Sequence, residues 1–377
     1  MWAPLLDVCD FQGGTQPPKE EWVDDFREGY VRMLQIRDYS QGKEKFVQYV
    51  KDTEKLHKCA SGDLMLSRYG YIGQVFTGLE GAYNVALVKV IKKRPVDTKY
   101  LYYYFQSEYF RRVLLSSVGA RATVPGFNKS ELAKAEIPLP SLSEQIEIGE
   151  KLGRVDAISE QYGRQLAKLD ELARARFIEL FGDPEANPFH WRRAALKDVA
   201  ADRLTYGSGA SSCAYDGDVR YVRITDINDS GELNGDIVSP SVVEDRYLLK
   251  DGDILFARSG ATVGKAYRYR ASEGRCLYAG YLIRLIPDQR QVLPDYIFYY
   301  TKTSCYKNFI ASNRRVAAQP NINARQYGEL LICVPPIDRQ REFASAVQKI
   351  NRQKWAVRQS LDKLELFKKA LMQQYFR

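Results

Sequence analysis

Short apolar runs separated by glycine-containing turns occupy two stretches of the chain, and this pattern predicts short β-strands. Each stretch also holds one longer and one shorter segment with apolar residues at helical spacing. We therefore expect two α/β or α+β domains. The predicted strands are 31–36, 64–67, 85–90, 222–227, 254–257 and 282–286.

Long segments with few helix breakers follow both stretches, from residue 143 to 181 and from 338 to 376. Apolar residues recur in both at the a and d positions of a heptad repeat, with Ser159 and Arg176 as weak members. The predicted helix-pairing and partner-interface residues are Ile148, Leu152, Val155, Tyr162, Leu166, Leu169, Phe343, Val347, Ile350, Val357, Leu361 and Leu364.

A helix of about 39 residues extends roughly 58 Å and cannot bury an apolar stripe by itself. We expect the two long α-helices to form an antiparallel coiled coil. Two independent helical linkers are the alternative interpretation. Gly182 and Pro184, followed by Pro188, end the first helix.

The chain contains an internal repeat, which five sequence matches in the same order support. The matched segments are 30–38 with 221–229, 62–70 with 252–260, 100–105 with 296–300, 125–128 with 320–323, and 137–140 with 332–335. We predict a pseudo-two-fold repeat, in which two domains (1–140 and 183–335) alternate with two spacer helices (141–182 and 336–377).

Length and charge agree with this plan. A chain of 377 residues, of which 45% are hydrophobic, is long enough to bury two cores. The 56 Lys and Arg residues exceed the 47 Asp and Glu residues, for a net charge of +9. This excess favours a polyanionic partner such as nucleic acid, although it also fits a soluble basic protein.

The six cysteines include no Cys-x-x-Cys pair, so we expect reduced thiols and neither disulfides nor a zinc site. The N-terminal ten residues do not resemble a signal peptide, and no apolar run approaches the roughly 20 residues that span a bilayer. These features predict a cytoplasmic protein.

No catalytic, cofactor or metal site is recognisable in the sequence. The only two histidines, His57 and His190, occupy non-matching positions of the repeat. The segment 259–266 has three residues between its glycines and Ala266 after the lysine, so it is not a phosphate-binding P-loop. The segment 187–190 lacks the second proline of the Asn-Pro-Pro-aromatic motif of amino-methyltransferases. We expect a protein that is not an enzyme.

The chain resembles the specificity (S) subunit of type I restriction-modification systems over essentially its whole length. The resemblance rests on the domain and helix plan, on residues 252–265, and on the junction 137–145, in which a Pro-x-Pro motif precedes Glu144 and Gln145. The second junction keeps the glutamine as Gln340 but has Arg339 in place of Glu144.

This resemblance implies a subunit that reads a bipartite, asymmetric site in double-stranded DNA with two target-recognition domains. It also implies two methyltransferase (M) subunits and a restriction (R) subunit as partners. S-adenosylmethionine would be bound by the M subunits, and ATP with Mg by the R subunit, so no cofactor is expected in this chain.

Candidate DNA contacts are basic or polar residues at strand ends and in loops. Arg32 and Arg223 alternate with apolar strand residues and are expected to face away from the core, either toward DNA or toward solvent. Arg68 and Arg258 precede glycine-rich turns, where they could hold a phosphate or bond to main-chain carbonyls. The neighbouring candidates are Tyr69, Ser259 and Lys265.

A second set lies in the loops 119–123 and 313–316. Arg121, Arg314 and Arg315 are expected just before short helices, near helix N-termini that favour phosphate. Lys129 and Gln319 complete the candidates. By contrast, Asn128 and Asn323 have the spacing of capping boxes, and the Tyr-rich run 100–109 has helical spacing typical of a core rather than of a base-stacking surface.

Two other functions remain open. A coiled-coil scaffold for proteins would lack sequence-specific DNA readout. An enzyme that combines recognition with cleavage or methylation conflicts with the missing motifs. Charge reversal at Arg258, Arg314 and Arg315 should separate DNA binding from partner binding.

Overall fold

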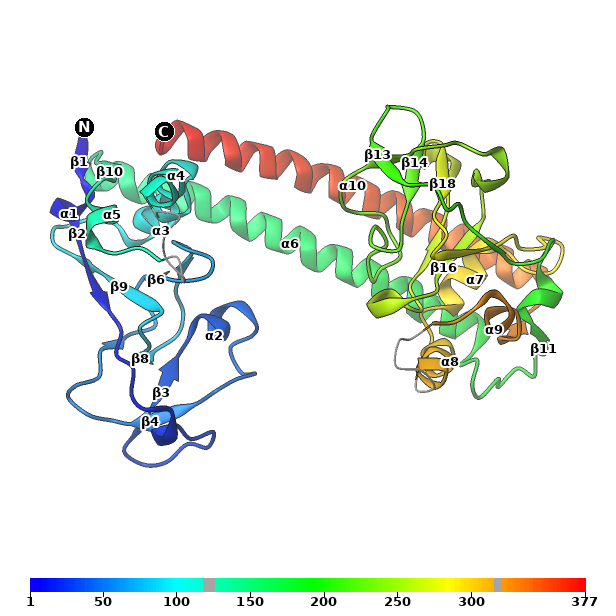
Figure 1. Ribbon diagram of the computed structural model, residues 1–377, viewed down its shortest axis with the longest axis horizontal. Coiled ribbons are helices and arrows are strands. Elements are labelled where there is room, and N and C mark those ends of the chain that lie inside the picture. The colour runs from blue at the N-terminus through cyan, green and yellow to red at the C-terminus, as the bar shows by residue number, and fades with distance from the viewer. Residues whose placement is uncertain (118–125, 315–320) are drawn as a thin grey trace. The chain divides into compact units, whose positions relative to one another are not determined.

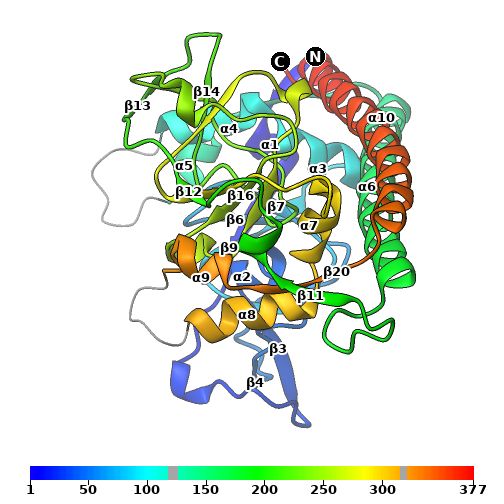
Figure 2. The ribbon, with the colours of Figure 1, turned by 90° about the vertical axis from the view of Figure 1, so that its right-hand side faces the viewer.

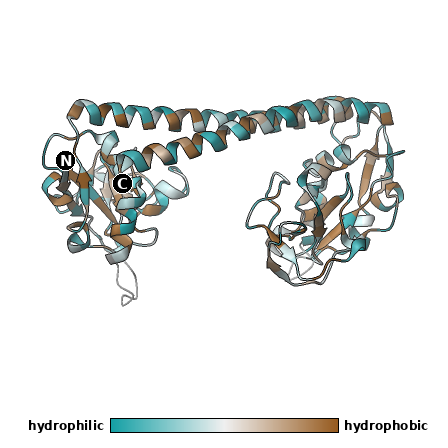
Figure 3. Cartoon of the chain, turned by 90° about the horizontal axis from the view of Figure 1, so that it is seen from above, coloured by the Kyte–Doolittle hydropathy of each residue, from teal (hydrophilic) through white to brown (hydrophobic). Residues whose placement is uncertain are grey.

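The computed structural model describes residues 1–117, 126–314 and 321–377. The chain divides into two compact units, which we call unit 1 (Met1–Gly163 with Arg358–Arg377) and unit 2 (Arg164–Val357). Within the described residues, every helix is too short or too polar to cross a membrane. Figure 3 shows hydrophobic residues concentrated on the strands of each unit.

Unit 1 contains three small antiparallel or mixed sheets with helices packed on them (Figure 1). Its strands are β1 (Trp2–Pro4), β2 (Cys9–Gly13), β3 (Tyr30–Leu34), β4 (Tyr49–Lys51), β5 (Lys58–Cys59), β6 (Met65–Ser67), β7 (Val75–Phe76), β8 (Gly81–Tyr83), β9 (Leu87–Lys92) and β10 (Glu136–Pro138). Its helices are α1 (Leu5–Val8), α2 (Ile36–Ser40), α3 (Thr98–Gln106), α4 (Glu108–Ser117), α5 (Lys129–Leu132), the first part of α6 (Leu142–Phe181) and the last part of α10 (Ile337–Tyr375).

Unit 2 repeats much of this order (Figure 2). Its strands are β11 (Arg192–Ala195), β12 (Thr205–Tyr206), β13 (Ser212–Ala214), β14 (Arg220–Val222), β15 (Val238–Pro240), β16 (Ile254–Ala257), β17 (Ala266–Arg268), β18 (Cys276–Tyr278), β19 (Leu282–Leu285) and β20 (Leu331–Val334). Its helices are the last part of α6, α7 (Pro294–Tyr300), α8 (Ser304–Arg314), α9 (Ala324–Gly328) and the first part of α10 (Ile337–Tyr375).

The sheets of the two units share their connectivity. The antiparallel order β2-β9-β6-β7 in unit 1 corresponds to β12-β19-β16-β17 in unit 2. The parallel pair β3-β8 corresponds to β14-β18, and the antiparallel pair β1-β10 corresponds to β11-β20. The mixed α/β class predicted from the sequence is therefore found in both units.

The Tyr-rich run of unit 1 belongs to the core, as predicted. Tyr100 and Tyr104 are fully buried in α3. Tyr100 Oη donates a hydrogen bond to the carbonyl of Pro138 at 2.6 Å, and Tyr104 Oη donates to the carbonyl of Glu136 at 2.9 Å. A buried hydroxyl needs such a partner, so these bonds attach α3 to strand β10.

Unit 2 makes the same two contacts with its own aromatic run. Tyr296 Oη donates to the carbonyl of Cys333 at 2.6 Å, and Tyr300 Oη donates to the carbonyl of Leu331 at 3.1 Å. These carbonyls lie on β20, the counterpart of β10. The matched bonds explain why both copies of the repeat place tyrosines at these positions.

A buried glutamine begins each long helix. The Gln145 side chain donates to the carbonyl of Pro140 at 2.9 Å and accepts a bond from the N-cap amide of α3. The Gln340 side chain donates to the carbonyl of Pro335 at 2.9 Å and accepts a bond from the N-cap amide of α7. Each glutamine thus connects the Pro-x-Pro or Pro-Pro junction to the aromatic helix of its unit.

In unit 1, the first part of α6 packs on the last part of α10. Asp156 pairs with Lys368 at 2.6 Å, and Lys151 donates to Tyr375 Oη at 3.3 Å. The residue order runs in opposite directions along the two segments, so they are antiparallel. Leu152 is buried in the same core as the end of α10.

In unit 2, the last part of α6 packs on the first part of α10, again antiparallel. Lys354 pairs with Asp170 at 2.7 Å, and Arg176 pairs with Glu342 at 2.6 Å.

The predicted heptad residues of both units are buried or half-buried. The buried ones are Leu152, Val155, Leu169, Phe343, Val347, Ile350 and Val357, and the half-buried ones are Ile148, Tyr162, Leu166, Leu361 and Leu364.

Several predicted boundaries were wrong. The strand predicted at 222–227 ends at Val222 because the Asp226 carboxylate accepts a bond from the Arg223 amide at 2.9 Å and fixes a turn. Each predicted longer helix is divided, into α3 and α4 or into α7 and α8. Ser107 caps α4 by accepting a bond from the Phe110 amide, which explains the first division.

Candidate DNA interface

Matched turns follow β6 in unit 1 and β16 in unit 2. Gly70 and Gly73 have positive φ angles of 71° and 77°, and Gly260 and Gly264 have 67° and 90°. A Cβ atom added to Gly73 would lie 2.6 Å from a side chain of α4, and one added to Gly264 would lie 2.8 Å from a side chain of α8. Glycine is therefore required both for the backbone conformation and for close packing of each turn on its helix.

Arg68 begins the turn of unit 1. Its Nε atom donates to the carbonyl of Phe127 at 3.0 Å, and its guanidinium carbon lies 5.3 Å from the centre of the Tyr69 ring. The main-chain bond is one of the two outcomes predicted for this arginine. Its Nη atoms make no hydrogen bond with the part of the chain that the structure describes, so they can still contact a phosphate or a base.

Arg258 occupies the same place in unit 2 with different neighbours. Its Nε atom lies 3.3 Å from Asn321 Oδ1, and its guanidinium carbon lies 4.6 Å from the centre of the Tyr206 ring. The Tyr206 side chain is 41% exposed, and its Oη accepts a bond from the Ala324 amide. This cation–π contact helps to hold the guanidinium group of Arg258 over the ring.

Each turn pairs with the segment that follows a loop carrying further candidates. Tyr69 forms an isolated antiparallel bridge with Gly126, and Ser259 forms one with Asn321. Arg121, Arg315 and Gln319 lie outside the described residues. The first described residue after each loop, Gly126 or Asn321, therefore lies beside a turn that carries an arginine.

Arg314 corrects a prediction. It is the last residue of α8, so it lies at a helix C-terminus and not before a helix N-terminus as expected. One Nη atom donates to the carbonyls of Ala261 and Val263, each at 3.1 Å. A cation is stabilised by the negative end of the helix dipole, and here it also supports the neighbouring turn.

Lys129 and Lys265 each form an ion pair, in which Lys129 is exposed and Lys265 is half-buried. Lys129 Nζ lies 2.8 Å from Asp10, and Lys265 Nζ lies 2.9 Å from Asp229. Hydrogen bonding to these lysines is the first cause that lowers the pKa of each aspartate. The exposed pair of Lys129 contributes at most about 1 kcal/mol, so a phosphate can replace Asp10 at low cost. Lys265 also donates to the carbonyl of Ile227 at 3.2 Å, which holds its ammonium group in place.

Arg32 and Arg223 are bound to buried carboxylates. Arg32 pairs with Asp38 at 3.0 Å, and Arg223 pairs with Asp226 at 2.8 Å. Both aspartates are buried, whereas the two arginine side chains are 19% and 31% exposed. Removing either arginine would leave a buried charge unpaired, which indicates a structural role for both.

Two exposed tyrosines beside the turns were missed by the sequence analysis. Tyr71 is 79% exposed in the turn of unit 1. Tyr281 is 63% exposed in unit 2, and its carbonyl accepts a bond from the Arg258 amide. The sequence does contain a signal for their exposure: each tyrosine adjoins a glycine turn and belongs to no helical or strand pattern. Such rings can contact sugars or bases.

Two predicted caps are confirmed. Asn128 and Asn323 begin α5 and α9 with complete capping boxes, in which Glu131 and Gln326 bond back to the asparagine amides. These asparagines position short helices directly after the two loops and are not needed for contact with a ligand.

Within the described ranges, no group of three metal-ligating side chains occurs. Burial raises the pKa of the Cys59 and Cys276 thiols to about 11. A thiol with such a pKa stays protonated at neutral pH and is a poor nucleophile. The polar groups around the two turns are suited to binding a polyanion.

Comparison with known proteins connects this geometry to a family. Residues 2–170 and 191–366 match the family described as "Type I restriction modification DNA specificity domain". The chain is 23% identical to the type I restriction enzyme MjaVIII specificity subunit of Methanocaldococcus jannaschii, covering 93% of this chain and 86% of the relative. It is 21% identical to the StySPI specificity subunit of Salmonella potsdam, covering 92% and 81%.

Solved structures show the same fold. The S subunit of a type I restriction-modification system from M. genitalium aligns with a TM-score of 0.59 and 17% identity, covering 100% of this chain and 96% of that chain. A chain from a structural study of complex assembly and conformational transition of the type I R-M system aligns with a TM-score of 0.56 and 17% identity, covering 100% and 97%.

Proposed function

From the premise that this chain belongs to the type I restriction modification DNA specificity family, we propose that it is the non-catalytic subunit that reads a bipartite, asymmetric DNA target. The observation that supports this most directly is the pair of matched glycine turns, each with an arginine that uses only its Nε atom in hydrogen bonds to the described residues. Arginine is well suited to phosphate and to guanine edges.

The two turns differ in the residues around their arginines, which supports two half-sites of different sequence. Target-recognition domains at 1–140 and 183–335 would each read one half-site. The spacer helices at 141–182 and 336–377 would pair as an antiparallel coiled coil and fix the separation of the half-sites. A pseudo-two-fold arrangement of this kind suits two copies of one partner.

The proposed partners are two M subunits, which would bind S-adenosylmethionine, and R subunits, which would use ATP and Mg. The exposed sides of α6 and α10 are the surfaces that we assign to the M subunits. The chain itself would supply recognition and geometry but no chemical step.

Selection from a randomised duplex library, with the chain and its M subunits together, tests the proposal. We expect enrichment of one motif with two defined parts separated by a fixed number of unspecified base pairs. Affinity should fall steeply as salt increases, because phosphate contacts release counterions. Recovery of a library without sequence preference would contradict DNA reading and favour the scaffold alternative.

A matched variant separates DNA reading from partner binding. Arg258→Gln should weaken binding to the selected duplex by roughly 5- to 150-fold, since one bidentate contact contributes about 1–3 kcal/mol. Arg290→Gln is the control, because Arg290 is 90% exposed and, among the residues that the structure describes, pairs with Asp288 alone, near the other end of β19. M-subunit binding should stay unchanged in both. Equal DNA binding by the two variants would refute the assignment of Arg258.

A further inference from the structure

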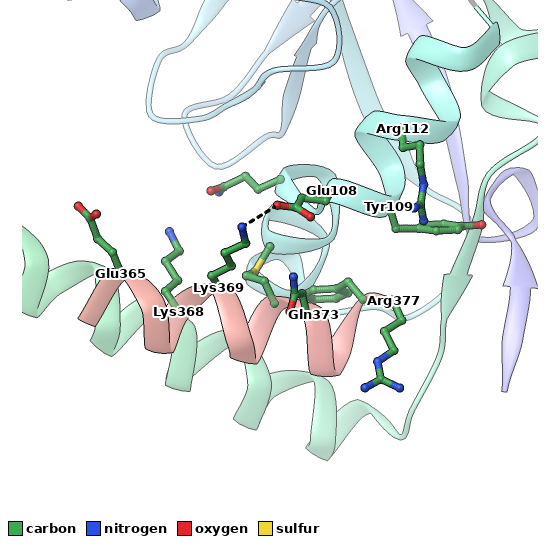
Figure 4. A pocket seen from close by; sticks show the side chains of 11 residues that line it. Glu108, Tyr109, Arg112, Glu365, Lys368, Lys369, Gln373 and Arg377 are labelled. Atoms are coloured by element: carbon green, nitrogen blue, oxygen red, sulfur yellow. Dashed lines mark ion pairs between the residues drawn. The ribbon is translucent and has the colours of Figure 1, made fainter. Parts of the chain in front are cut away.

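A cavity of about 490 Å³ lies in unit 1 between the first turns of α4 and the last turns of α10. Tyr109, Met372 and Phe376 give it an apolar wall. Figure 4 shows Lys369 extending from α10 toward α4, which contributes Glu108 and Arg112 on the other side. The cavity thus combines an apolar wall with charged groups.

The charged groups at the cavity are only loosely engaged. Lys369 Nζ lies 3.7 Å from Glu108 Oε1, and these side chains are 62% and 75% exposed. Arg112 is exposed and makes no hydrogen bond or ion pair within the ranges that the structure covers. Both cations can therefore accept a new carboxylate at little cost.

The repeat allows the cavity of unit 1 to be compared with the corresponding positions of unit 2. Phe376 at the end of α10 packs on Tyr100 with ring centres 5.1 Å apart, and Phe181 at the end of α6 packs on Tyr296 at 4.9 Å. The end of α6 in unit 2 therefore corresponds to the end of α10 in unit 1. By position in α8 and α4, Asn308 corresponds to Arg112.

In unit 2 the segment that follows α6 lies against two of the corresponding positions, Cys305 in place of Tyr109 and Asn308 in place of Arg112. Pro184 is buried, and its carbonyl accepts a bond from the Arg193 side chain at 3.4 Å. The next residue, Glu185, accepts a bond at Oε2 from Asn308 at 3.3 Å. A smaller cavity of about 150 Å³ remains beside these residues. A proline followed by a carboxylate thus lies beside the unit 2 counterparts of Tyr109 and Arg112.

We propose that the cavity of unit 1 is a docking site for an extended acidic segment of another protein. Its proline or small apolar side chain would pack on Tyr109 and Met372, and its carboxylate would bind Arg112 and Lys369. Arg112 in place of Asn308 would make the contact with a carboxylate charge-assisted, and such a hydrogen bond is stronger than a neutral one. This site does not depend on DNA recognition.

The probe is a fluorescein-labelled peptide with the sequence of residues 182–189, Gly-Asp-Pro-Glu-Ala-Asn-Pro-Phe, titrated with the full chain and followed by fluorescence polarisation. A matched peptide carries Asn and Gln in place of Asp and Glu. We expect saturable binding of the acidic peptide, and affinity at least about tenfold lower for the neutral one. Absence of saturable binding, or equal binding of both peptides, would overturn the proposal.

The combined variant Arg112→Glu and Lys369→Glu should weaken acidic-peptide binding by at least about tenfold. Lys363→Glu is the control, because Lys363 is exposed on α10 and does not line the cavity. Unchanged thermal unfolding would show that each variant folds. If Lys363→Glu weakened peptide binding equally, the loss of affinity would come from the net charge of the protein and not from the cavity. Displacement of the peptide by stoichiometric duplex DNA would assign the surface to nucleic acid instead. Either result would refute the docking site.

Discussion

Arg68 of unit 1 bonds to a main-chain carbonyl, whereas Arg258 of unit 2 bonds to a side-chain amide and stacks on Tyr206. The hydrogen bonds that the buried tyrosines and the junction glutamines make to main-chain carbonyls are, by contrast, the same in the two units. Bonds to main-chain carbonyls do not depend on the identity of the residue that offers them. The framework can therefore be kept while the side chains around each turn change.

The two units also differ in one charged pair beneath the central sheet. Asp253 and Arg284 of unit 2 pair at 2.7 Å, with side chains 2% and 7% exposed. Their counterparts, Asp63 and Lys89 of unit 1, pair at 2.6 Å but are 29% and 22% exposed. Burial raises the pKa of Asp253. The same pair is therefore placed in two different dielectric environments.

The largest effect is predicted for a substitution that removes one member of this pair in unit 2. Asp253→Ala should lower the free energy of unfolding by about 3–5 kcal/mol, because Arg284 would be left buried without its partner. Asp63→Ala should cost about 1 kcal/mol or less, since Lys89 can reach water. Denaturant unfolding of both variants measures the difference. Equal losses would show that burial does not distinguish the two pairs.

The next prediction tests what the units share. Gln145→Leu and Gln340→Leu should each lower the free energy of unfolding by about 1–2 kcal/mol, because each leaves a partly buried main-chain amide and at least one main-chain carbonyl unpaired. Chemical denaturation monitored by circular dichroism gives both values. A cost confined to one variant would contradict the view that the two junctions are equivalent.

A smaller effect is expected at the ring that orients Arg258. Tyr206→Leu should weaken duplex binding about fivefold, through loss of a cation–π contact of roughly 1 kcal/mol. Tyr206→Phe keeps the ring and loses only the bond from the Ala324 amide, so its affinity should stay closer to the wild type. In an Arg258→Gln background, Tyr206→Leu should have no further effect. An unchanged loss in that background would mean that the ring acts independently of Arg258.

Local sequence patterns predicted the features that depend on neighbouring residues. The capping boxes at Asn128 and Asn323 and the buried tyrosine run follow from spacings of three or four residues. The contact of Arg314 joins residues 51 and 53 positions apart, so no local pattern could show that it supports a turn. The buried partners of Arg32 and Arg223 were missed because an alternating strand pattern gives the direction of a side chain and not its partner.

The smallest predicted effect concerns Lys302, which lies in the turn between α7 and α8. Burial lowers its pKa from 10.5 to about 8, against the opposing influence of Asp170 and Glu232. Between about pH 8 and pH 10.5 the unfolded chain keeps a proton that the folded chain has released. The free energy of unfolding contributed by this group therefore rises with pH across that range.

Lys302→Met should remove this contribution. The free energy of unfolding of the variant should exceed that of the wild type most below pH 8. This difference should decrease by about 1 kcal/mol between pH 7 and pH 9. Lys307→Met is the matched control, since Lys307 is exposed on α8. The difference between Lys307→Met and wild type should not change with pH. If Lys302→Met likewise tracked the wild type at every pH, the cost of burying this ammonium group would have to be offset by Asp170 and Glu232, and the cluster would be an ordinary ion-pair network.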